Sequence, residues 1–166
     1  MKRALQKLIV GAALRVVYAA LVELRAMDAT VAAELAKLPA GMSYAIHTGH
    51  RCPTLYVQWD GERLLCPATL EKPRCELHLK SLATAFRLFT GQMGLAQAYA
   101  QHAFTMAGEV ADVMRLARLV NRTEAYLFPP FITKKFLTDT PRLPASPLRM
   151  YARLAVGFLT GRYATL

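Results

Sequence analysis

The sequence is poor in the residues that most enzymes use for chemistry. Its 166 residues include only 11 acidic side chains, 3 cysteines and 1 tryptophan. Its few serines (Ser43, Ser81 and Ser146) all lie outside the G-x-S-x-G turn that presents a hydrolase nucleophile. No pair of carboxylates flanks a turn, as acid–base catalysis would favour. These absences predict a protein that is not an enzyme, with no catalytic residues and no cofactor.

The cysteines are also too few and too far apart for a disulfide framework. Cys52, Cys66 and Cys75 are an odd number and form no C-x-x-C pair, which favours a reducing, cytoplasmic location. The run His47-x-x-His50-x-Cys52 has the composition of a metal site. On a strand, however, residues three apart point to opposite faces, so we interpret these histidines as ordinary strand-end residues and predict no metal.

The charge is unevenly distributed. The net charge is +10, of which residues 1–25 and 140–166 carry +4 each. Apolar residues surround both basic ends, a combination typical of segments that meet an anionic membrane surface. The predicted membrane contacts, at the inner face of the membrane, are Lys2, Arg3, Lys7, Arg149 and Arg153. The alternative is that both ends pack on the domain and their charges are solvated.

The first apolar segment is predicted not to cross a membrane. Its apolar stretch, Leu8 to Val22, contains Arg15 and is shorter than the roughly 20 residues that a spanning helix needs. No small-residue cleavage site follows cleanly, so we do not expect a signal peptide.

One motif is consistent with nucleic-acid binding. Gly91 and Gly94 enclose Gln92 and Met93 in a G-x-x-G loop, which RNA-binding KH modules use to clamp a phosphate backbone. No basic residue lies in this loop or in residues 95–101, so we predict no nucleic-acid partner.

Hydrophobic periodicity predicts helices and short strands in one α+β chain. Asp28 is a candidate N-cap for the second helix, and we expect the first four strands to form an antiparallel meander. The predicted helices cover residues 3–25, 29–37, 82–90, 95–101, 109–128, 132–137 and 148–160, and the predicted strands residues 44–48, 55–59, 62–66, 75–79 and 103–107. We divide the chain into an N-terminal amphipathic helix (1–27), a central domain (28–138) and a proline-rich linker with a basic amphipathic helix (139–166).

Large apolar side chains are concentrated in residues 82–127. They are typical of a packed core, but Met and Phe also suit a cavity that adapts to a lipid. Composition does not separate these two alternatives. The candidate cavity walls are Phe86, Phe89, Met93, Tyr99, Phe104, Met106, Val110 and Met114.

Four short segments follow one another in the second half of the chain: Phe86-Arg-Leu-Phe-Thr-Gly91, Ala98–Phe104, Thr105-Met-Ala-Gly108-Glu109 and Leu116-Ala-Arg-Leu119. Together they resemble the sterol carrier protein 2 (SCP-2) domain family. The segments Lys37-Leu-Pro-Ala-Gly41 and Glu124-Ala-Tyr-Leu-Phe-Pro129 are similar to a bacterial branch of lipid carriers. The chain departs from the family at Glu109, where Asp or Asn is usual.

The resemblance implies a roughly five-stranded, mostly antiparallel sheet covered by helices, with extra helices at both ends. It also implies non-enzymatic binding or transport of a lipid with a fatty-acyl or prenyl chain. The alternative is an accessory or scaffold subunit of a lipid- or quinone-modifying enzyme complex. A homodimer or an enzyme-complex partner is compatible with either function.

Overall fold

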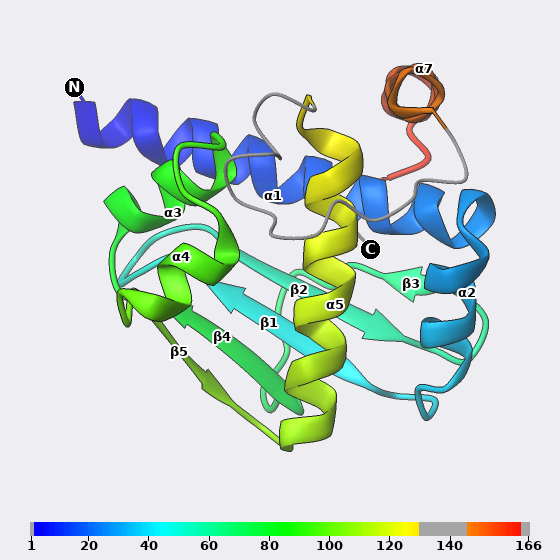
Figure 1. Ribbon diagram of the computed structural model, residues 1–166, viewed down its shortest axis with the longest axis horizontal. Coiled ribbons are helices and arrows are strands. Elements are labelled where there is room, and N and C mark those ends of the chain that lie inside the picture. Colours follow the sequence, from blue (N-terminus) through cyan, green and yellow to red (C-terminus); the bar gives the residue numbers. More distant parts are fainter. Residues whose placement is uncertain (1, 130–145, 164–166) are drawn as a thin grey trace.

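The computed structural model describes residues 2–129 and 146–163 and shows a five-stranded sheet packed against helices (Figure 1). In chain order, the elements are α1 (Lys2–Met27), α2 (Ala29–Ala36), β1 (Ser43–His47), β2 (Thr54–Trp59), β3 (Leu64–Leu65), β4 (Cys75–Leu79), α3 (Leu82–Phe89), α4 (Leu95–Ala100), β5 (Phe104–Ala107), α5 (Val110–Leu127) and α7 (Pro147–Leu159). The predicted α+β class, with extra helices at both ends, is confirmed. The predicted helix 132–137 lies outside the described residues.

The order of the strands corrects one prediction. The sheet has the order β3-β2-β1-β4-β5, and β4 pairs with β1 in parallel, whereas the other three strand pairs are antiparallel. The sheet is therefore mostly antiparallel, but the predicted meander is wrong at β4. The chain between β3 and β4 returns to the centre of the sheet, because β1 is buried along nearly its whole length and needs a strand on each side.

One face of the sheet holds the core. Along β2 and β4, buried residues alternate with more exposed ones, as expected for a sheet covered on one side. Residues of α1 and α5 pack together against Ile46 and Val57 on the covered face. The opposite face carries partly exposed polar side chains, including His47 and Glu76.

The N-terminal helix belongs to the same core as the sheet. Val10, Leu14 and Leu24 of α1 are buried and join the main hydrophobic cluster, whereas Leu5 and Leu8 are exposed. By length and composition α1 could also cross a membrane, with a mean hydropathy of 1.7 over its most apolar window. A third of that window is buried in the fold, and the helix lies near the N-terminus.

Asp28 connects three helices at the end of α1. Its side chain accepts a hydrogen bond from the Thr30 backbone at 2.9 Å and so caps α2, as the sequence predicts. The same carboxylate pairs with Arg122 at 2.7 Å and accepts a bond from the Tyr126 hydroxyl at 3.1 Å, both on α5. These bonds lower the pKa of Asp28 by more than its burial raises it.

A buried carboxylate, Glu23 of α1, holds the C-terminal helix. It bonds to Arg153, to Arg162 at 2.8 Å and to the Tyr163 hydroxyl at 2.7 Å. Tyr163 packs directly on Gly157 of α7, where a Cβ atom would collide with its ring. The C-terminal helix therefore docks on α1 through one charged centre.

Candidate functional site

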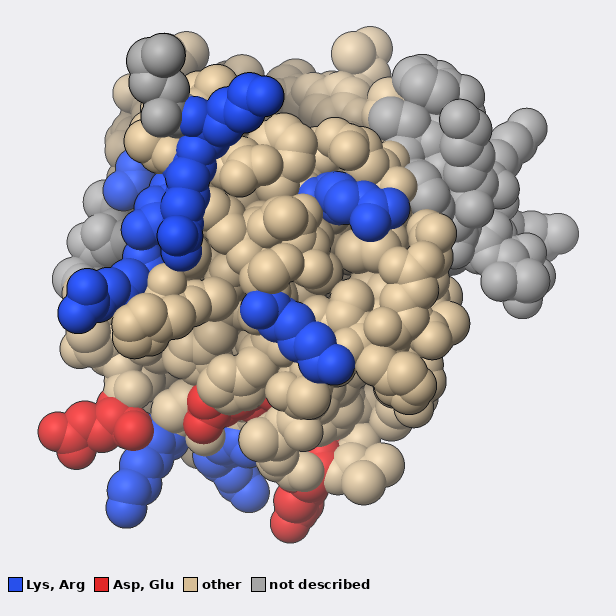
Figure 2. All heavy atoms as spheres, turned by 90° about the vertical axis from the view of Figure 1, so that its left-hand side faces the viewer, with Lys and Arg blue, Asp and Glu red and all other residues tan. Residues whose placement is uncertain are grey.

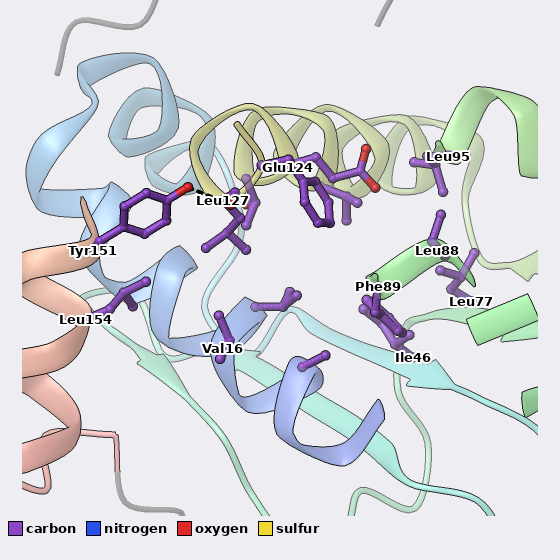
Figure 3. Close-up of a pocket in the computed structure, with 15 residues that line it drawn as sticks. Val16, Ile46, Leu77, Leu88, Phe89, Leu95, Glu124, Leu127, Tyr151 and Leu154 are labelled. Carbon is purple, nitrogen blue, oxygen red and sulfur yellow. Dashed lines mark hydrogen bonds between the residues drawn. The ribbon is translucent and has the colours of Figure 1, made fainter. Parts of the chain in front are cut away.

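An apolar cavity of about 300 Å³ lies between α1, α3, α5, α7 and the covered face of the sheet (Figure 3). Its lining is almost entirely apolar. The residues around it are Ala13, Val16, Val17, Ile46, Leu77, Leu88, Phe89, Leu95, Val120, Thr123, Glu124, Leu127, Phe128, Tyr151 and Leu154. The volume is at the lower end of the range for small-molecule sites.

The repeats of the helices and strands explain which side chains line the cavity. On α5, Val120, Glu124 and Leu127 recur at spacings of four and three residues and so share one side of the helix. Parallel pairing of β1 and β4 places Ile46 next to Leu77 as the floor. Each wall thus comes from a different element, and only their packing encloses the space.

Glu124 contributes a carboxyl group to this lining (Figure 3). The other polar side chains of the wall have partners, since the Thr123 hydroxyl bonds to the Leu119 carbonyl at 2.7 Å and the Tyr151 hydroxyl to the Leu127 carbonyl at 2.8 Å. No hydrogen bond or ion pair to the Glu124 carboxylate occurs within residues 2–129 and 146–163. Burial without a partner raises the pKa of Glu124 to about 7.

A second, inner void lies next to the cavity. Val17, Ile46 and Val120 line both spaces, and the inner void measures about 20 Å³. Tyr44 also lines the inner void, and its hydroxyl is buried and has no hydrogen-bond partner in the described part of the chain. Burial raises the pKa of Tyr44, so this hydroxyl stays protonated at neutral pH. The core is therefore incompletely filled at two neighbouring places.

The predicted wall residues mostly lie elsewhere. Of the eight, Phe89 alone lines the cavity. Met93 and Phe104 are buried in the core, and Phe86 and Met106 are partly buried against it. The remaining three are exposed, at 69% for Tyr99, 78% for Val110 and 52% for Met114.

The physical reason for this correction is the rotation of α5. Met114 and Leu116 are about 200° apart around a helix, so only one of them can face the core. The buried residue is Leu116, at 6% exposure. Val110 is the first residue of α5. The number of large apolar residues in the sequence does not show which side of α5 faces the core.

Sequence reasoning missed the contributions of α1 and α7, and it missed Glu124. A detectable signal was present, because Glu124 is a single acid between Val120 and Leu127 on the inward side of a long helix. Glu124 is partly buried there, and an acidic residue on the inward side of a helix without a charged partner is a candidate for a site.

The predicted membrane contacts fall into two groups. Lys2 and Arg3 are exposed on the first turn of α1, and Lys7 donates a hydrogen bond to the Arg51 carbonyl at 2.6 Å. On this side of the molecule, Lys and Arg lie across the upper part and also along the lower edge, where the acidic side chains in view lie beside them (Figure 2). Arg149 of α7 is exposed, but Arg153 is engaged with the buried Glu23.

The comparisons with known proteins give a distant likeness. No family model matches the chain, and no curated protein matches its sequence. Among solved structures, the chain is similar to one described as "UbiJ-SCP2 Ubiquinone synthesis protein", with 9% sequence identity and a TM-score of 0.44. The match covers 61% of this chain and 89% of that chain.

Proposed function

We propose that the protein binds a lipid or another long apolar molecule in the cavity and carries or holds it without chemical change. The observation that carries this proposal is a hollow of about 300 Å³ that core side chains leave unfilled. Protein interiors are close-packed and contain few voids larger than a water molecule. Each CH₂ group that moves from water into such a space contributes about 0.8 kcal/mol. A fatty-acyl or prenyl chain therefore binds with few polar contacts.

Protein purified from cells without detergent is expected to retain an apolar molecule, which native mass spectrometry detects. After delipidation, the protein is expected to bind a pyrene-labelled fatty acid methyl ester in a saturable manner and at a single site, because the cavity is the binding space. Fluorescence titration measures this uptake. Delipidated protein that folds but takes up neither this ester nor the labelled free acid would contradict the proposal. A stoichiometric enzyme partner in a pull-down, without any uptake, would instead support the accessory-subunit alternative.

Glu124 makes the proposed binding depend on pH. Its pKa of about 7 reflects a carboxyl group that burial keeps partly protonated near neutrality. A neutral apolar ligand displaces water from the cavity and so disfavours the charged carboxylate further. We therefore expect the affinity for the labelled ester to fall as pH rises through 7. The total fall is about tenfold for each pH unit by which the bound ligand raises the pKa of Glu124 further.

The matched variant for this prediction is Glu124→Gln, which keeps the size and polarity of the side chain but removes its titration. Its affinity is expected to be flat between pH 5.5 and 8.5 and to resemble that of wild type at the acid end. Wild type and variant curves that fall in parallel would assign the pH dependence to another group.

The start of α1 supports docking at the inner face of an anionic membrane as the route of ligand exchange. Leu5 and Leu8 are 58% and 71% exposed and lie among Lys2, Arg3 and Lys7. Exposed apolar side chains with adjacent cations are typical of interfacial helices. Each Lys or Arg near an anionic surface contributes about 1 kcal/mol.

Sedimentation with liposomes is expected to show binding that requires anionic lipid and weakens with salt. In a double variant, Lys2→Glu with Arg3→Glu, binding is expected to fall more than tenfold. The exposed Lys72→Glu, which is distant in sequence from α1, serves as a charge control and is expected to have a smaller effect. Equal binding to neutral and anionic liposomes would exclude this docking mode.

A further inference from the structure

Three side chains that commonly bind metals lie together on the sheet face opposite the cavity. Parallel pairing places His47 of β1 beside His78 of β4. Glu76 precedes His78 by two residues and therefore projects from the same face of β4. Two strands that are far apart in the sequence thus bring an acid and two imidazoles to one place.

The geometry of the three ligand atoms is compact. The Glu76 Oε2 atom lies 3.1 Å from His47 Nε2 and 2.8 Å from His78 Nε2, and all three atoms lie within 4.8 Å of one another. The two imidazole rings stack with centroids 4.4 Å apart and planes 10° apart, and both Nε2 atoms contact the same Glu76 oxygen. Ligand atoms around a tetrahedral zinc ion, at 2.0–2.2 Å from the metal, are about 3.4 Å apart. A tetrahedral site would require the two Glu76 contacts to open by about 0.3–0.6 Å and the stacked rings to rotate until both Nε2 atoms face one ion.

The surroundings of His47 match those of a metal-bound histidine. Its Nδ1 atom lies 3.4 Å from the Thr54 hydroxyl, and an outer-shell partner of this kind fixes the orientation of a ligating ring.

A surface hollow adjoins the cluster and leaves room for a further ligand. His47 and His78 line this hollow, together with Thr54 and the basic residues Arg51 and Lys80. A metal ion held by three protein ligands keeps its fourth position for water or another molecule. The nearby cations would favour an anion there.

We propose that His47, Glu76 and His78 form a binding site for a divalent transition-metal ion, with Zn²⁺ as the ion that the ligand set fits best. Two imidazole nitrogens and one carboxylate oxygen suit Zn²⁺ and similar ions, whereas Mg²⁺ and Ca²⁺ prefer oxygen ligands only. The site is independent of lipid binding, because its side chains project from the uncovered face of the sheet. The sequence run His47-x-x-His50-x-Cys52 shares only His47 with it.

Calorimetric titration of chelator-treated protein that carries no histidine tag tests this site. We expect one equivalent of Zn²⁺ to bind, Co²⁺ to bind with the visible absorption of a low-coordinate complex, and Mg²⁺ not to compete. Zinc is also expected to raise the melting temperature, because the ion links β1 to β4 and binds the folded chain only.

Single variants locate the ligands. His47→Ala, Glu76→Gln and His78→Ala are each expected to weaken Zn²⁺ binding by about 100-fold or more, beyond the effect of an outer-shell partner. His50→Ala is the control, because His50 lines the same hollow but is outside the cluster, and it should bind zinc as wild type does. Circular dichroism without metal checks that each variant folds. No zinc binding by the wild type, or binding lost in His50→Ala and kept in His78→Ala, would overturn the proposal.

Discussion

Replacing Glu23 with Ala is expected to lower the free energy of unfolding by about 2–4 kcal/mol and to release α7 from the domain. Glu23 is fully buried, whereas the side chains of Arg153 and Arg162 are 36% and 48% exposed. Removing one member of a buried ion pair typically costs about 3–5 kcal/mol. We expect a somewhat smaller loss, because both arginines can turn to solvent once their partner is absent. Urea unfolding measures the change.

The pH dependence of stability provides a second measurement. Burial raises the pKa of Glu23, but the hydrogen bonds from Tyr163, Arg153 and Arg162 lower it more, so the pKa lies below the ordinary value of 4.5. Glu23 therefore contributes to the free energy of unfolding above its unfolded-state pKa, and this contribution is lost as pH falls through its lower, folded-state pKa. Glu23→Gln lacks the titratable carboxyl group, so the difference in stability between this variant and wild type is expected to shrink in acid.

Two further variants separate the effect of the Glu23 charge from the effect of the packing of Tyr163 on Gly157. Gly157→Ala leaves every charge in place but drives a Cβ atom into the Tyr163 ring, so it should also expose α7 to hydrogen exchange. Glu71→Ala removes an exposed acid and is expected to change stability by less than about 0.5 kcal/mol. Unchanged amide protection of α7 in both Glu23→Ala and Gly157→Ala would show that the Glu23 centre does not hold this helix.

Filling the cavity is expected to have the largest effect on ligand binding. In Val120→Trp, an indole ring occupies the space between α5 and the sheet, where Val120 lines both the main cavity and the inner void. Each CH₂ of the ligand that is excluded costs about 0.8 kcal/mol, so the loss of two reduces affinity by more than tenfold. Titration with the pyrene-labelled ester measures the loss. Overpacking itself costs about 1–3 kcal/mol of stability, which thermal unfolding monitors.

The control lies on the same helix. Val110→Trp makes the same substitution at an exposed position, and affinity for the ester is expected to stay within twofold of wild type. This pair also tests the sequence-based prediction that Val110 lines the cavity. Loss of binding in Val110→Trp with retention in Val120→Trp would place the ligand at the surface near the start of α5 and would contradict the cavity described above.

Local patterns in the sequence predicted much of the fold. The alternation of Leu55, Val57 and Trp59 indicates a strand with one covered face, and the structure has that strand. Asp28 caps the second helix as predicted, because its short acceptor side chain satisfies a free backbone N–H nearby in the chain. These features depend on contacts between residues close in sequence. Periodicity and residue type are therefore sufficient to find them.

The sequence by itself determined the type and order of the helices and strands that the structure describes, the mixed α+β architecture and the predominance of apolar side chains. Only the tertiary structure decided that β4 pairs with β1, that α1 and α7 contribute walls to the cavity, and that His47 meets Glu76 and His78. The physical reason is that packing between segments that are far apart in the sequence decides which strands pair and which side of each helix is buried in the core. A period of two or 3.6 residues shows which residues share a face, but not which other segment that face contacts.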